Sequence, residues 1–179
     1  SDTLRKTFDT IADAASVDLD VLVRAADPLA GDDPASATRA PVPQSLLDQL
    51  AGLDGVAQAR GAITFLPAVT LPDGEAARTT GAPILGFSWT PPLPGSNPPI
   101  DFVDGRGPQA PDELAIDRDA ARKYGLAVGD TLGIRGVGGD GRFEISGILT
   151  FGDSGSGAYY LIFTPAAAQQ LSNLPGQYQ

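Results

Sequence analysis

The chain has 179 residues, enough for one domain with a substantial core, and its 42% hydrophobic and 19% charged residues are ordinary for a globular protein. Its 12 Lys and Arg against 22 Asp and Glu give a net charge of -10, which would repel the phosphates of a nucleic acid. The absence of Cys and His excludes a disulfide scaffold, the usual zinc and haem sites, and every nucleophile that an imidazole activates.

The N-terminal part of the chain predicts two helices, one strand and a loop. Apolar residues recur at helical spacing over 1–15, and residues 17–23 alternate apolar with polar side chains, as a half-buried strand does. Residues 25–42 have no apolar period and predict a mobile loop. From Pro43 the leucines again have helical spacing, so a helix is predicted as far as Leu53.

The middle of the chain predicts strands separated by turns. Residues 56–71 are mostly apolar, with β-branched residues from 63 to 71, and predict a strand. Pro67 indicates that this strand lies at a sheet edge or contains a bulge. A second strand is predicted over 84–89, followed by an extended proline-rich connection over 91–99.

The C-terminal half predicts a compact strand, turn and helix. The strand covers 113–116, Asp117 caps the helix that follows, and Gly125 ends that helix. Two further strands over 131–135 and 142–151 flank a glycine-rich tip, which is typical of a hairpin.

The last predicted elements are a strand over 158–163 and a helix that Thr164 caps and Pro165 opens. Together the elements predict an α+β fold, a mixed sheet with packed helices plus a small β-rich hairpin subdomain at about 126–151. We expect residues 1–179 to form a single domain.

Two motifs that resemble active-site sequences have structural explanations. Gly136, Gly138 and Gly141 match the spacing of a dinucleotide-binding loop, but that loop must open a helix, and here a strand follows. Residues 152–155 read Gly-Asp-Ser-Gly, as around a protease nucleophile, but no histidine can activate Ser154. A lysine base is not expected either, because Lys6 and Lys123, the only lysines, belong to the polar faces of predicted helices.

Acidic residues do not have the spacing of a calcium loop, so no metal site is predicted and turn carboxylates and helix caps explain them. The candidates considered were Asp32, Asp33, Asp101, Asp104, Asp112, Asp117 and Asp119.

Apolar side chains bracket the proline-rich connection. They include Phe87, Trp89, Leu93 and Phe102. Packing against the core is the favoured interpretation, and a candidate partner or ligand surface is the alternative.

Residues 105–134 contain the most informative pattern, a Gly-Arg-Gly-Pro turn, a Glu-Leu-Ala-Ile-Asp strand, and a helix that ends in Gly-Leu-Ala-Val-Gly-Asp. Arg106 can pair with a carboxylate such as Glu113, and the glycines suit turns. The order of residues resembles the extracytoplasmic domains of FtsX-like, or MacB-type, ABC transporter permeases. The structural motif consists of Gly105, Arg106, Pro108, Glu113, Asp117, Gly125, Gly129 and Asp130.

The resemblance extends over residues 2–8, 143–148 and 162–171. It implies a MacB periplasmic-core-like fold at the extracytoplasmic side of the cell membrane, between the first two of four transmembrane helices. Such a domain couples ATP hydrolysis in the cytoplasm to export, to lipoprotein or lipid handling, or to signalling. It implies no catalytic residue and no cofactor in this domain, since ATP binds to a partner nucleotide-binding subunit.

The partners that the resemblance implies are the ATP-binding cassette ATPase, the permease's own transmembrane helices, and a lipoprotein, peptide, lipid or cell-wall hydrolase. A dimer is expected in the full transporter. Because the family usually continues with further strand and helix after the segment like 166–171, a truncated C-terminus is also an expectation.

Two other functions remain as alternatives. The aromatic and proline-rich stretch around Trp89 suits a free-standing extracytoplasmic ligand-binding or adhesion module. A hydrolase that uses two carboxylates alone, such as Asp117 and Asp153, would place them across a cleft.

Overall fold

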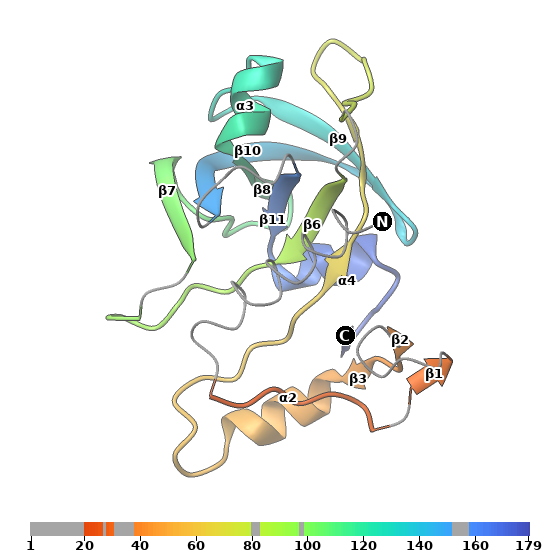
Figure 1. The fold of residues 1–179 in the computed structure, drawn as a ribbon, viewed down its shortest axis with the longest axis vertical. Helices are drawn as coiled ribbons and strands as arrows, with labels where there is room; N and C mark the ends of the chain where they lie inside the picture. The colour runs from red at the N-terminus through yellow and green to blue at the C-terminus, as the bar shows by residue number, and fades with distance from the viewer. Residues whose placement is uncertain (1–19, 27, 31–37, 80–82, 97–98, 152–157) are drawn as a thin grey trace.

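The computed structural model describes residues 20–26, 28–30, 38–79, 83–96, 99–151 and 158–179. Over these residues the fold is α+β, as predicted, with three helices, an eight-stranded mixed sheet and two sheets of two strands (Figure 1). The helix predicted over 1–15 lies outside the described residues. No described helix has the length and apolarity needed to cross a membrane.

The main sheet has the strand order β4-β6-β11-β8-β10-β9-β5, and β7 pairs with the C-terminal half of β10 beyond the end of β9. The pairings of β8 with β10 and of β6 with β11 are parallel, and the others are antiparallel. The strands are β4 (Thr64–Phe65), β5 (Ala68–Thr70), β6 (Ile84–Ser88), β7 (Ile100–Gly105), β8 (Glu113–Asp117), β9 (Thr131–Gly136), β10 (Gly139–Phe151) and β11 (Tyr159–Phe163).

The sheet curls because one short segment supplies both of its ends. β4 pairs with β6 at one end of the strand order and β5 pairs with β9 at the other, yet only Leu66 and Pro67 separate them in the chain. The prediction of one continuous strand over 56–71 is wrong, since Pro67 belongs to neither strand. The expected edge position holds for the two strands beside it, β4 and β5. Proline has no N–H to donate in a strand ladder, so the strand ends there and the chain passes to the other edge of the sheet.

Both faces of the curled sheet carry apolar side chains. The main core lies inside the curl, where Phe163 is fully buried and its ring lies 5.3 Å from that of Phe143 and 5.5 Å from that of Phe65. The next residue back along β11, Ile162, points to the opposite face with Leu149. Strand side chains alternate between faces, so two apolar faces explain why these strands are almost continuously apolar.

Two short helices pack on the main core; both begin as their sequences predict, and α3 also ends as predicted. α3 (Arg118–Tyr124) begins after Asp117 and ends at Gly125, which has a left-handed conformation. α4 (Pro165–Leu171) begins after Thr164, whose hydroxyl accepts a hydrogen bond from Ala167 N. Ala120 and Ala121 of α3 and Ala167, Ala168 and Leu171 of α4 are buried in the core.

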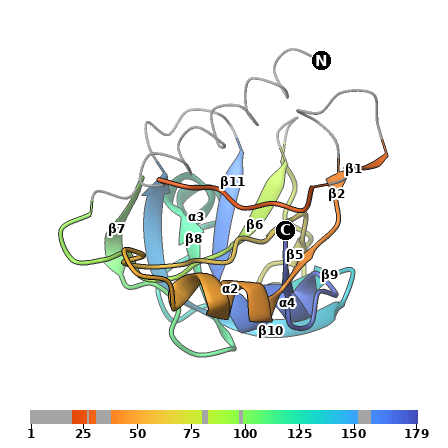
Figure 2. The same ribbon diagram turned by 90° about the horizontal axis from the view of Figure 1, so that it is seen from below.

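A smaller part of the fold surrounds α2 (Gln44–Ala51), below the sheet in Figure 1 and at the front in Figure 2. β1 (Pro28–Ala30) pairs with β2 (Thr38–Arg39), and β3 (Val42–Pro43) pairs with β12 (Gln177–Tyr178). The loop predicted over 25–42 therefore contains short strands.

Two other predictions for this part need correction. Residues 20–25 are not in a strand, and Val21 is 75% exposed, so the strand predicted over 17–23 is wrong where the structure describes it. Alternation alone does not make a strand; a neighbouring strand must take up its backbone hydrogen bonds. The helix predicted to reach Leu53 ends two residues earlier, because Gly52 caps it. The division into a single domain with a subdomain at 126–151 stays a prediction.

Candidate functional site

The loop between β7 and β8 is closed by an ion pair. Arg106 donates two hydrogen bonds to Glu113, from Nη1 to Oε2 at 2.8 Å and from Nη2 to Oε1 at 2.6 Å. The backbone amides of Gln109 and Ala110 donate to Oε2 of the same carboxylate, at 2.7 and 3.1 Å. The pairing expected from the sequence is confirmed, and we call this four-donor arrangement the Arg106–Glu113 clamp.

The clamp keeps Glu113 ionised. Hydrogen bonds from Arg106 foremost, together with the two backbone amides, lower the pKa of Glu113 from 4.5 to about 2. The side chain of Glu113 is 15% exposed but that of Arg106 is 49% exposed, so water screens part of their attraction. A carboxylate with this pKa takes up no proton near neutral pH, which suits a structural role better than acid-base chemistry.

Next to the clamp, two backbones come into direct contact. Arg106 N donates to Ser146 O at 2.9 Å. A Cβ on Gly105 would lie 2.3 Å from Ser146 O, and a Cβ on Gly147 would lie 2.3 Å from Arg106 O. Only glycine fits at both positions, so the clamp loop lies directly on β10.

Asp117 ends β8 and begins α3. It is 2% exposed, and its Oδ1 accepts hydrogen bonds from Asp119 N at 2.9 Å and Ala120 N at 3.2 Å. Burial raises the pKa of Asp117, against the opposing effect of these two bonds. The predicted helix cap is confirmed, and this cap is a partly desolvated carboxylate.

Gly129 and Asp130 shape the turn between α3 and β9. Gly129 has a φ of 95° and donates its N–H to Ile145 O at 2.9 Å. Asp130 Oδ2 accepts from Ala127 N at 2.8 Å. In the clamp loop, Pro108 is buried. The motif residues thus fix the backbone at three successive junctions around β8 and α3.

Three of the four side chains proposed as a partner or ligand surface pack on the outer face of the sheet. Phe87, Trp89 and Phe102 are half-buried against a cluster that includes Leu149. The rings of Trp89 and Phe102 meet edge to face, 5.7 Å apart between centroids. Leu93 is 40% exposed. This geometry is what packing requires, and contact with a partner stays a prediction.

The glycine-rich tip belongs to the hairpin of β9 and β10, as predicted. Gly136 ends β9, Gly138 lies in the turn, and Gly141 is in β10. Gly138 N donates to Leu171 O at 2.9 Å, so the tip packs on the C-terminal end of α4. A strand follows the glycines, and the geometry of a dinucleotide loop is not formed.

The hypotheses of a metal site, a serine nucleophile and a pair of catalytic carboxylates involve several residues that the structure does not describe. Within the described ranges, no three Asp or Glu side chains lie close enough to share a metal ion. Asp32, Asp33, Asp153 and Ser154 lie outside the described residues, so the proposed pairing of Asp117 with Asp153 stays untested.

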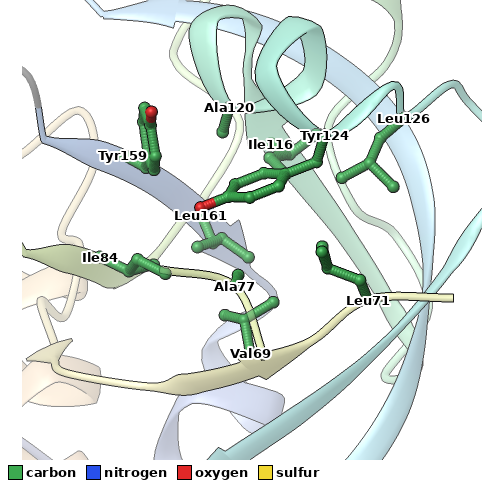
Figure 3. Close-up of a pocket in the computed structure, with 10 residues that line it drawn as sticks. All are labelled: Val69, Leu71, Ala77, Ile84, Ile116, Ala120, Tyr124, Leu126, Tyr159 and Leu161. Atoms are coloured by element: carbon green, nitrogen blue, oxygen red, sulfur yellow. The ribbon is translucent and has the colours of Figure 1, made fainter. Parts of the chain in front are cut away.

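A small apolar cavity lies between the sheet and α3, with the ring of Tyr124 extending over it (Figure 3). Its volume is about 10 Å³, the space of about one water molecule, and its lining offers no polar surface to hold one. Lys123 Nζ and Tyr124 Oη both donate to Arg78 O, at 2.7 and 2.5 Å. We interpret the cavity as a packing imperfection. It is lined by Val69, Leu71, Ala77, Ile84, Ile116, Ala120, Tyr124, Leu126, Tyr159 and Leu161.

A larger hollow, here called the arginine groove, lies on β5, β9 and β10 and has a volume of about 340 Å³. Arg135 and Arg142 are its cations and Asp140 is its anion. Sequence reasoning did not identify it, because its residues come from three strands. The period-two alternation in the predicted hairpin was the available signal. Its lining residues are Ala68, Thr70, Gly133, Ile134, Arg135, Asp140, Gly141 and Arg142.

Comparison with known proteins identifies the family. Residues 1–179 match the family described as MacB-like periplasmic core domain. A search of curated proteins finds no match. The curled mixed sheet with packed helices is consistent with that fold, and the residues that suggested the resemblance form the junctions around β8 and α3. The chain therefore belongs to the family of MacB-like periplasmic core domains.

Proposed function

We propose that this domain passes conformational changes, driven by ATP hydrolysis on a partner ATPase, to a substrate or partner outside the membrane. Because the chain belongs to this family, it is an extracytoplasmic domain of an ABC transporter permease. The match over the whole of residues 1–179 is the observation that carries the proposal.

The connections around β8 support a role in transmitting force. β8 pairs with β10 on one side and β11 on the other, and its two ends are held by the clamp and by the Asp117 cap. Charge-assisted, two-pronged hydrogen bonds such as those of Arg106 fix geometry as well as adding energy. A load applied to the β7–β8 loop would therefore pass to the centre of the sheet.

The proposal has further parts, which membership of the family supports. The domain needs no cofactor of its own, because ATP binds to the partner subunit. Its substrate or partner is a lipoprotein, a peptide, a lipid-linked molecule or a cell-wall hydrolase, and the full transporter works as a dimer.

The location of the domain can be tested with a single cysteine: residues 1–179 contain none, and any cysteine elsewhere in the full-length protein is first replaced by serine. Val137 is 88% exposed at the hairpin tip, so Val137→Cys in the full-length protein should react with a membrane-impermeant maleimide added to intact cells. Leu132 is fully buried, so Leu132→Cys should react only after denaturation. Labelling of Val137→Cys only after the cells are lysed would overturn an extracytoplasmic location.

Fractionation of the same labelled protein distinguishes a permease from a free-standing extracytoplasmic binding or adhesion module. A permease should remain in the membrane pellet after an alkaline carbonate wash and should copurify from detergent with an ABC ATPase. A free-standing module would be labelled equally well, but the wash would release it. Release of the labelled protein would therefore remove the permease proposal and leave the alternative.

A further inference from the structure

We propose that the arginine groove is a binding site for an oxyanion, a carboxylate or phosphate group held between Arg135 and Arg142. The inference rests on the strand register and on the charges of the groove. It does not depend on the proposed role in a permease.

The register places the two arginines on one face of the sheet. In the antiparallel pairing of β9 with β10, Arg135 lies opposite Asp140 and Gly133 lies opposite Arg142. Residues directly opposite share a face, and so do residues two apart on one strand. The arginines are therefore diagonal neighbours, roughly 7–8 Å apart, a separation that two long guanidinium side chains can close around one anion.

The middle of this face is hollow because its residues are small. β5 pairs with β9 so that Ala68 lies opposite Arg135 and Thr70 lies opposite Gly133. Gly133 has no side chain, and a Cβ there would already lie 3.2 Å from the Cβ of Thr70. The arginine side chains thus border a space in which the Thr70 hydroxyl is a further donor.

Neither guanidinium is neutralised within the part of the chain that the structure describes. The ion pairs found there join Arg106 with Glu113 and Arg118 with Asp119, and no side-chain hydrogen bond of Arg135 or Arg142 is found among the described residues. Each guanidinium is planar, carries one positive charge and has five N–H donors, so the pair offers ten donors. This geometry suits the two-pronged recognition of carboxylate and phosphate.

The negative charge of Asp140 allows a second test, in which a substitution should strengthen anion binding. Asp140 lies in the groove opposite Arg135, and among the residues that line the groove it lowers the formal charge from +2 to +1. An anion bound between the arginines would be repelled by this carboxylate. Removing the charge of Asp140 should therefore strengthen binding, whereas removing either arginine should weaken it.

The test uses the folded chain and follows backbone amide NMR signals during titration with sodium phosphate or sodium citrate at constant ionic strength. We expect saturable shifts at residues of the groove with at least one of the two anions. Arg135→Gln and Arg142→Gln should each weaken binding roughly tenfold, the usual scale for a charged hydrogen bond. Asp140→Asn should tighten it, and Arg122→Gln, an exposed arginine on α3, should leave it unchanged.

Each outcome decides the proposal. Saturation by phosphate alone identifies a phosphate site, and saturation by citrate alone identifies a carboxylate site. No saturable shift with either anion overturns the proposal, as does equal weakening in Arg122→Gln, which would indicate nonspecific attraction. Because Asp140→Asn should improve binding, a misfolded arginine variant cannot imitate the full pattern; unchanged or weaker binding in Asp140→Asn, with its spectrum otherwise preserved, would also overturn it.

Discussion

Folding shifts the pKa values of the two carboxylates at the ends of β8 in opposite directions. Glu113 begins the strand among hydrogen-bond donors, and its pKa falls to about 2. Asp117 ends the strand, where burial raises its pKa. A pKa that differs between the folded and unfolded chain makes stability depend on pH, so these two residues should give contributions of opposite sign.

Glu113→Gln should lower the free energy of unfolding by about 1 kcal/mol at pH 7, because glutamine offers no charge to the half-exposed Arg106. The wild-type contribution is fully present above the ordinary pKa of 4.5 and is lost as the pH falls to about 2. The stabilities of wild type and variant should therefore converge over that window. Urea unfolding at several pH values measures this, with the exposed Glu75→Gln as the control. A gap that stays constant down to pH 2 would contradict the assignment.

Asp117→Asn keeps an oxygen for the helix cap but removes a buried charge. Because the pKa of Asp117 is raised, its stabilising contribution is present below the ordinary 3.8 and is lost as the pH rises through the raised value. The variant should therefore be more stable than wild type at pH 7 and equal to it near pH 3. Asp117→Ala, which removes the cap, should lose about 1 kcal/mol. Greater stability of wild type than Asp117→Asn at pH 7 would refute this.

At the scale of elements, local signals predicted the helices and central strands well. α3 and α4 were predictable because Asp117, Gly125 and Thr164 act on backbone groups within a few residues of themselves. The pairing of Arg106 with Glu113 was predictable because the two residues are close in the chain and opposite in charge. In these cases the residues that determine the structure are neighbours in the sequence.

Elements that depend on distant partners were not predictable. β7 was missed because prolines precede it and the strand with which it pairs among the described residues is β10, far along the chain. Residues 20–23 alternate like a strand but are exposed, and Pro67 sends β4 and β5 to opposite sheet edges. The arginine groove needs the register of β5, β9 and β10 together, which no local pattern contains.

The contact between the clamp loop and β10 can be tested with a matched pair of glycines. Gly105 and Gly125 have φ values of 63° and 64°, but only Gly105 has a backbone atom in the way of a Cβ. Gly125→Ala should cost about 1–2 kcal/mol from the left-handed backbone alone. Gly105→Ala should cost clearly more in the free energy of unfolding measured with urea, because Ser146 O must also move. Equal costs would show that the contact relaxes freely.

At the scale of the whole molecule, β12 joins the part around α2 to the sheet. β12 pairs with β3, and Gln44 N, at the start of α2, donates to Gly176 O at 2.8 Å. On the other side, Tyr178 is 6% exposed and belongs to the main core, where a Cβ on Gly61 would lie 2.3 Å from its ring. No residue of α2 is fully buried, so this helix depends on such connections for its position.

Tyr178→Ala should therefore loosen α2 more than it loosens the sheet. Loss of a buried aromatic ring costs about 3–5 kcal/mol in a core. Hydrogen exchange should rise most over α2 and β3, since β8 and β10 keep their ladders on both sides. Tyr178→Phe is the control: it keeps the buried ring and loses only the hydroxyl, which interacts with Gln44 and Asp48 of α2, so exchange over α2 should rise clearly less than in Tyr178→Ala. A uniform rise in Tyr178→Ala over α2, β8 and β10 would instead mean that the chain opens as one cooperative unit, and that the part around α2 has no independent stability.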